Sequence, residues 1–141
     1  MNIYLDTNIF LYSTEPNSPF YPSCIQLIEY CQNHKIIIST STETIQEIIH
    51  YSKNHKQFEK GLECANFTLE LVDIMYSVNQ ETIKIYLQKS RVYKLSTSRD
   101  LLHLSSSLEN QINYLITYDG GFSIFKEIKA ITPEEFLRKL K

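Results

Sequence analysis

The chain reads I-I-I-S-T-S-T-E-T-I-Q-E over residues 36–47, an apolar β-branched run followed directly by a predicted helix. The run is apolar on both of its faces, which is expected of a strand buried between two layers of helices. Thr40 and Glu43 have the spacing of a capping box, the reciprocal pairing of side chains and backbone that begins many helices. This stretch therefore predicts a strand inside a sheet and a helix that packs beside it.

Strands and helices alternate in both directions from this stretch. On its N-terminal side, an apolar strand over residues 2–6 precedes a helix that begins near Pro22. On its C-terminal side, the pattern predicts helices over 54–71, 79–94 and 97–108, strands within 71–78, 113–118 and 127–131, and a last helix from residue 132. Strands separated by helices indicate an α/β fold, a parallel sheet with helices on both faces. With no linker or repeat, residues 1–141 are predicted to form a single domain.

The composition is typical of a globular protein and does not by itself indicate a class of ligand. Hydrophobic residues make up 43% and charged residues 21%, and no apolar run reaches membrane-spanning length. The start carries no signal-peptide pattern, so a cytoplasmic location without membrane association is expected. Cys24, Cys31 and Cys64 form no CxxC pair and are expected to be buried thiols. The net charge of −2 does not indicate a nucleic-acid binder, so any such chemistry must depend on local groups.

Aspartate occurs only at positions 6, 73, 100 and 119, and three of these positions adjoin predicted strand or helix ends. Ligands of open α/β sheets bind outside the carboxyl ends of the strands, a geometry that could bring Asp6, Asp100 and Asp119 together. Taken singly, Asp100 could complement a helix dipole and Asp119 could belong to a turn. Asp6 follows a buried apolar strand, where a carboxylate needs a partner or a metal.

A fourth acid comes from the helix after the second strand. Glu43 and Glu47 are both candidates, because they are four residues apart and share one helical face. That face lies away from Ile45 and Ile48, so periodicity alone favours a solvated surface. We favour Glu47 because Glu43 has a structural role in the predicted capping box, and both alternatives stay open.

The third acidic segment lies on a helix with a clear apolar stripe. Leu101, Leu104 and Leu108 define the stripe, and Asp100 lies at its margin, where it can face a cleft. His103 falls further round, on the polar side. We predict that His103 is a surface residue or supports the ligands from behind, rather than being a ligand itself.

These segments together resemble the motifs of the PIN-domain family, and in particular the VapC-like toxins of bacterial toxin–antitoxin pairs. The matching segments are I-Y-L-D-T-N-I-F (3–10), I-S-T-S-T-E-T-I-Q-E (38–47), R-D-L-L-H-L-S (99–105) and L-I-T-Y-D-G-G-F (115–122). They follow the family's order and span nearly the whole chain. Two positions depart from the pattern: Tyr118, where asparagine is frequent, and Ser105, where alanine is common.

The resemblance implies a metal site built on Asp6, Glu47, Asp100 and Asp119, with Asn8 and Thr117 orienting carboxylates or water. It implies magnesium or manganese as the cofactor, since both prefer oxygen ligands, and hydrolysis of single-stranded or loop RNA. It also implies a homodimer and a protein antitoxin that occludes the site.

Contacts with RNA are less clearly marked in the sequence. Arg91, Lys94 and Arg99 precede the third motif and could meet phosphates, although an ordinary solvated basic cluster is the commoner case. Tyr118 could stack on an unpaired base. We therefore take Arg99 and Tyr118 as candidate substrate-binding residues.

Other functions fit the sequence less well than a nuclease does. A phosphatase of the haloacid dehalogenase type needs a second aspartate two positions after the first, where this chain has Asn8. A phosphoacceptor receiver domain needs paired acids near the first strand, where this chain has only Asp6. An inactive PIN-like scaffold that binds RNA or protein, and a housekeeping PIN nuclease without an antitoxin, remain alternatives. Two like charges about 5 Å apart repel by roughly 3 kcal/mol at an effective dielectric of about 20. A scaffold has no need to hold four mutually repelling acids together, so the four acids favour an enzyme.

Overall fold

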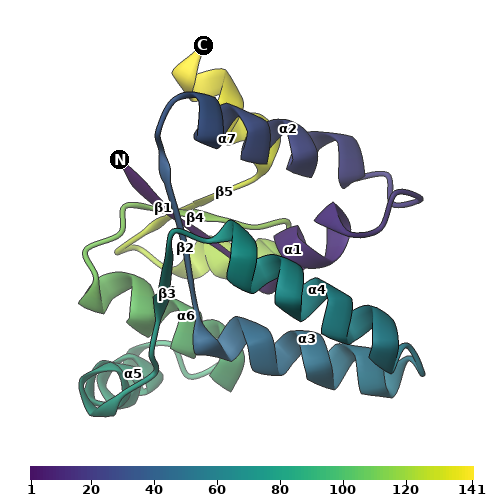
Figure 1. Cartoon of the computed structure of the whole chain (residues 1–141). Helices are drawn as coiled ribbons and strands as arrows, with labels where there is room; N and C mark the ends of the chain where they lie inside the picture. The colour runs from purple at the N-terminus through teal and green to yellow at the C-terminus, as the bar shows by residue number, and fades with distance from the viewer.

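A five-stranded parallel sheet forms the centre of the molecule, in the strand order β3-β2-β1-β4-β5 (Figure 1). The computed structural model describes residues 1–141. The strands are β1 (Asn2–Leu5), β2 (Ile37–Ser41), β3 (Ile74–Tyr76), β4 (Tyr114–Ile116) and β5 (Lys129–Ile131). The helices are α1 (Thr7–Ser13), α2 (Tyr21–Asn33), α3 (Thr42–Asn54), α4 (Phe58–Leu71), α5 (Gln80–Val92), α6 (Ser98–Glu109), the 3₁₀ helix η1 (Gly120–Ile124) and α7 (Pro133–Leu140). The predicted α/β class is confirmed.

Alternate residues of the strands divide the core into two layers. In β1, the side chains of Ile3 and Leu5 join the cluster that contains residues of α1, α2, α4 and α7. Tyr4, between them, joins the second cluster, with residues of α6 and the segment that includes η1. Figure 1 shows α2 with α7 on one side of the sheet and α5 with α6 on the other. Because β1 is buried on both faces, it reads as a continuous apolar run.

Three helices end at residues that the sequence does not mark as helix ends. Lys35, Lys56 and Gln111 have φ angles of 55°, 55° and 58°, the left-handed conformation that glycine usually supplies. At Lys56, the amide of Gln57 closes α3 by donating to the carbonyl of Ser52 at 2.8 Å. The helix predicted over 54–71 therefore begins only at residue 58. The short helix α1 was not predicted.

The capping-box interpretation of Thr40 and Glu43 is wrong. Thr40 is still part of β2, and α3 begins at Thr42 with Ser41 as its N-cap and no side-chain capping bond. The Thr40 hydroxyl donates to the carbonyl of Leu5 at 2.8 Å and thereby ties β2 to β1. The three cysteines are buried free thiols, as expected. No helix has the length and apolar character to cross a membrane.

Helices α3 and α4 pack closely where Gly61 faces Ser52. A Cβ atom added at Gly61 would lie 2.2 Å from Ser52 Oγ and 2.3 Å from Ser52 Cβ, so the helices would have to separate. We expect Gly61→Ala to lower the free energy of unfolding by about 2 kcal/mol, the usual effect of overpacking. Gly120→Ala is the matched control, because nothing lies within 4 Å of its added Cβ. Urea unfolding of both variants checks this, and equal stabilities would contradict it.

Candidate metal centre

One cavity of about 250 Å³ is lined by all four predicted acids: Asp6, Glu47, Asp100 and Asp119. Asp6 directly follows β1, and Asp119 follows β4. These two strands are neighbours although the chain visits β2 and β3 between them, so their ends lie where the strand order reverses. Open parallel sheets bind ligands at this point. Glu47 reaches the cavity from α3, and Asp100 reaches it from the first turn of α6.

Asp6 is the most deeply placed of the four, with 5% of its surface exposed. One carboxylate oxygen accepts from the amide of Thr7 at 2.7 Å and caps α1. The other accepts from the Thr117 hydroxyl at 2.7 Å and from Asn8 Nδ2 at 3.2 Å. Asn8 and Thr117 therefore hold the Asp6 carboxylate in one orientation.

Asp100, in the first turn of α6, and Asp119, the N-cap of η1, both lie close to Gly121. A Cβ atom at Gly121 would lie 3.1 Å from Asp119 Oδ1 and 3.5 Å from Asp100 Oδ2. Asp119 also accepts from the Gly121 amide at 2.8 Å, which begins η1. Gly121 thus lies beside both carboxylates at the cavity, and its amide orients Asp119.

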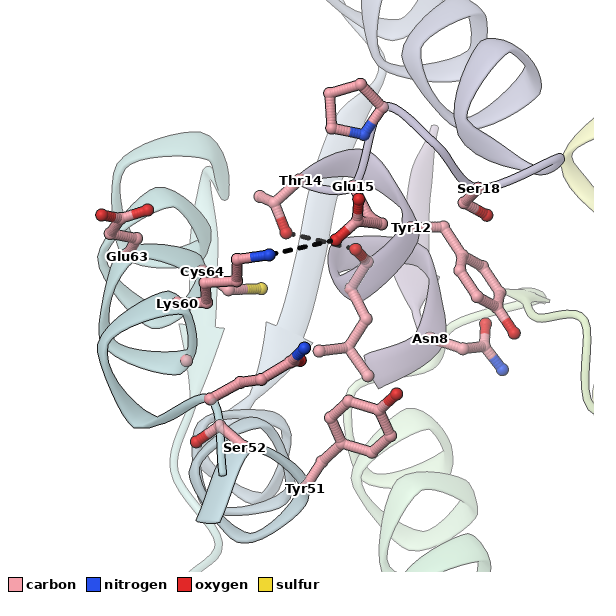
Figure 2. Close-up of a pocket in the computed structure, with 14 residues that line it drawn as sticks. Asn8, Tyr12, Thr14, Glu15, Ser18, Tyr51, Ser52, Lys60, Glu63 and Cys64 are labelled. Carbon is pink, nitrogen blue, oxygen red and sulfur yellow. Dashed lines mark hydrogen bonds and ion pairs between the residues drawn. The ribbon is translucent and has the colours of Figure 1, made fainter. Parts of the chain in front are cut away.

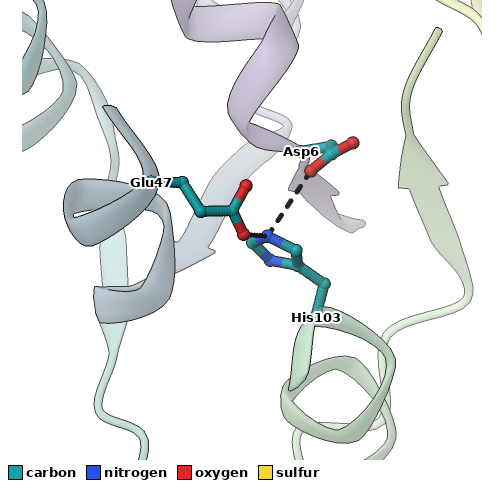
Figure 3. A group of neighbouring side chains, drawn as sticks. All are labelled: Asp6, Glu47 and His103. Carbon is teal, nitrogen blue, oxygen red and sulfur yellow. Dashed lines mark hydrogen bonds and ion pairs between the residues drawn. The ribbon is translucent and has the colours of Figure 1, made fainter. Parts of the chain in front are cut away.

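His103 is not a surface residue, and that part of its prediction is wrong. Its side chain is 1% exposed, and its Nε2 lies 2.6 Å from Glu47 Oε1 and 3.5 Å from Asp6 Oδ1. Figure 3 shows the imidazole between the two carboxylates. The error arises because α6 is buried nearly all round: Ser105, Ser106 and Ser107 are also fully buried. An apolar stripe therefore does not mark the whole buried surface of this helix.

Glu43 and Glu47 are both partly or fully covered, so the solvated face predicted by periodicity is also wrong. Glu43 is buried, and the side chain of Glu47 is 16% exposed. Helix α3 packs against both α4 and α6, so its polar side is partly covered by neighbouring helices. Of the two acids, Glu47 lines the cavity and contacts His103, whereas Glu43 is not among the lining residues.

The carboxylates differ in how readily they ionise. Burial raises the pKa of Asp6, despite the opposing effects of His103 and Thr117. Burial, followed by repulsion from Asp119 and Asp6, raises the pKa of Asp100 to about 6. Burial also acts to raise the pKa of Glu47, but the hydrogen bond and charge of His103 outweigh it and lower that pKa. Without a bound cation, ionising Asp6 and Asp100 in this cavity therefore costs free energy.

The two candidate substrate-binding residues occupy different places. Arg99 is exposed and lines the cavity. The ring of Tyr118 packs at 4.4 Å from that of Phe20, and its hydroxyl donates to Glu134 at 2.9 Å; it does not line the cavity. Asp73, the acid left out of the predicted site, accepts from the amide of Ile38 and is separate from the cavity.

A second cavity, of about 390 Å³, adjoins the first between α1, α3 and α4 (Figure 2). The two cavities share Asn8, Leu11 and Tyr51. Figure 2 shows Lys60 and Glu15 pointing toward one another, an ion pair of 3.9 Å. A ligand in the second cavity would therefore lie next to the acids in the first.

The donor set suits a hard divalent cation. The cavity presents carboxylate oxygens, the ligands that magnesium and manganese prefer. One histidine, His103, lies beside Asp6 and Glu47. Its Nε2 is engaged by Glu47, however, and His103 is not among the residues that line the cavity. The four acids thus fit such an ion.

Comparison with known proteins gives consistent matches over nearly the whole chain. A PIN domain is matched over residues 3–128. Ribonuclease VapC13 of Mycobacterium tuberculosis is 23% identical over 129 residues, which cover 92% of this chain and 98% of that protein. VapBC2 from Rickettsia felis, bound to a DNA fragment from their promoter, has a TM-score of 0.76 at 16% identity, with 92% and 97% of the two chains covered. Mycobacterium tuberculosis VapC20, a sarcin–ricin loop cleaving toxin, has a TM-score of 0.72 at 12% identity, with 90% and 97% covered.

Proposed function

Because the chain belongs to the PIN-domain family, we propose that it is a magnesium-dependent endoribonuclease that hydrolyses single-stranded or loop RNA as the toxin of a toxin–antitoxin pair. The observation that carries this proposal is the convergence of Asp6, Glu47, Asp100 and Asp119 on one cavity. The names of the relatives, a VapC ribonuclease and a sarcin–ricin loop cleaving toxin, support the activity and the kind of substrate.

The four acids would hold one or two Mg²⁺ or Mn²⁺ ions through carboxylate oxygens. When bound, such an ion activates water as a nucleophile and neutralises charge on the attacked phosphate. The surrounding residues fix the geometry: Thr117 and Asn8 hold the Asp6 carboxylate, and the Gly121 amide donates to Asp119. Arg99, exposed at the same cavity, is the proposed contact for an RNA phosphate.

Cleavage of RNA is expected to depend on the divalent ion. Purified protein incubated with total RNA should produce defined cleavage products with Mg²⁺ or Mn²⁺, and EDTA should reduce the rate at least about 100-fold, because the acids alone supply no cationic group for the phosphate. Adding excess Mg²⁺ after EDTA should restore cleavage. Sequencing of the new RNA ends would identify the target.

Undiminished cleavage in EDTA would contradict the metal mechanism. Binding of RNA without cleavage under any divalent ion would instead favour the inactive PIN-like scaffold. A single preparation tested with and without chelator therefore separates the nuclease from this alternative.

The proposed partners are a protein antitoxin and a second copy of the chain. An antitoxin segment seated in the second cavity would adjoin the acids, because Asn8, Leu11 and Tyr51 line both cavities. An adjacent small reading frame whose product blocks cleavage would distinguish a toxin from a housekeeping nuclease. Light scattering of the purified chain would show whether it is a homodimer.

A further inference from the structure

His103 is buried against the proposed metal ligands, and the proposed mechanism gives it no role. Its ring connects two elements: Nδ1 lies 2.5 Å from the hydroxyl of Tyr4 on β1, and Nε2 lies 2.6 Å from Glu47 Oε1 on α3. The Tyr4 hydroxyl is in turn 2.7 Å from Ser41 Oγ at the end of β2. A continuous chain of hydrogen bonds thus runs from the sheet, through α6, to one acid of the cavity.

The contact with Glu47 determines that Nε2 of His103 is protonated and donates a hydrogen bond. An ionised carboxylate only accepts, so Nε2 must be the donor in the 2.6 Å contact. The Tyr4 hydroxyl donates to Ser41 Oγ, so its oxygen accepts from Nδ1; if the Tyr4 hydroxyl turned toward His103, Nδ1 would accept instead. The N–H to Glu47 is therefore present whether the imidazole is neutral or charged.

Packing prevents the imidazole from turning away. The ring of Tyr4 meets the imidazole edge-on, with 5.6 Å between the ring centroids and 69° between the planes. The centroid of the Phe122 ring lies 6.3 Å from that of the imidazole. Tyr4 and Phe122 are themselves fully buried. Glu47, in contrast, has a long side chain that is partly exposed, so a rigid donor restricts its orientation.

We propose that the Tyr4–His103 pair is a positioning device that holds the Glu47 carboxylate in the orientation required by the metal. This inference rests on the proposed function, because it assigns a role within the same site. His103 is a positioning residue and not itself a ligand: Nε2 cannot both donate to Glu47 and coordinate an ion. Partners of this kind behind the ligands typically contribute 10–100-fold to metal affinity or activity.

The experiment measures Mn²⁺ binding to metal-free full-length protein by electron paramagnetic resonance, alongside RNA cleavage at saturating Mn²⁺. We expect His103→Leu to weaken Mn²⁺ binding at least about tenfold, and His103→Gln, which can present an N–H to Glu47, to recover part of the loss. Tyr4→Phe keeps the ring and removes only the hydroxyl, and should weaken binding by roughly two- to tenfold. His34→Gln is the matched control, because His34 is exposed and bonds only within α2.

A double-mutant cycle with Glu47→Gln tests whether His103 acts through Glu47. In that background, His103→Leu should cause little further loss of Mn²⁺ affinity. Losses that multiply would overturn the proposal, as would a nitrogen hyperfine coupling to Mn²⁺ that disappears in His103→Leu, since that would make His103 a ligand. So would variants that unfold more easily but bind Mn²⁺ normally when folded. Absence of Mn²⁺-dependent cleavage in the unmodified protein, with Mn²⁺ binding intact, would contradict the proposed function alone.

Discussion

Asp6→Asn is expected to reduce metal-dependent RNA cleavage about 1,000-fold or more while leaving the fold intact. The substitution replaces a charged ligand by a neutral one at the most buried of the four acids. Metal coordination contributes several kcal/mol of transition-state stabilisation, and 4 kcal/mol corresponds to about three orders of magnitude in rate. Cleavage rates at saturating Mg²⁺ provide the measurement.

The fold should survive because asparagine keeps much of the local hydrogen bonding. Its carbonyl oxygen can still accept from the Thr7 amide and cap α1. The amide group then replaces the oxygen that accepts from Thr117 and Asn8. Thr117 Oγ1 already accepts from Asn8 Nδ2 and from the Asp119 amide, so the bonds on this side are lost. We therefore expect the free energy of unfolding to fall by about 1 to 2 kcal/mol without loss of the fold.

Asp73→Asn is the matched control for this variant. Asp73 is the same residue type, but it accepts from the Ile38 amide at 2.8 Å and lies away from the cavity. Its substitution should leave cleavage unchanged. If Asp6→Asn retained more than a tenth of the normal rate under these conditions, Asp6 would not be an essential ligand.

The sequence predicted the sheet and the convergence of the acids because both depend on backbone topology. Apolar strands separated by helices produce a parallel sheet, and parallel strands bring their carboxyl ends to one edge. Asp6 and Asp119 adjoin the ends of neighbouring strands, so their proximity follows from strand order. The strand order itself was not predicted from spacing; the family resemblance supplied the expectation that four acids meet.

His103 was misplaced because periodicity describes only the side of a helix that faces the sheet. Helix α6 also packs against α3 and α5, and those contacts bury its polar side as well. A signal was present in the sequence: His103 lies between Leu102 and Leu104 and is followed by three serines, small residues that permit close packing on every side. The end of α3 had no such signal, because Lys56 occupies a position where glycine is the usual marker.

Asp100→Asn is expected to stabilise the metal-free protein at neutral pH while reducing cleavage about 100-fold. Burial, then Asp119 and Asp6, raise the pKa of Asp100 to about 6 from an ordinary value of 3.8. Since the folded state holds this proton more tightly than the unfolded state, the stability contributed by protonated Asp100 is full below pH 3.8 and is lost as the pH rises through about 6. The full shift corresponds to about 3 kcal/mol, which we reduce to roughly 1 kcal/mol because Asp100 is partly exposed.

The difference between the two proteins across pH isolates this group from the other acids. In EDTA, the variant and the unmodified protein should have similar free energies of unfolding near pH 4, and the variant should be more stable by roughly 1 kcal/mol at pH 7. Saturating Mg²⁺ should narrow or reverse that advantage, because an ion that binds the folded state stabilises it and the variant has lost a ligand. Parallel stability curves in EDTA would show that Asp100 ionises normally. If Mg²⁺ left the difference in free energy of unfolding between the variant and the unmodified protein unchanged, Asp100 would not be a ligand of the ion.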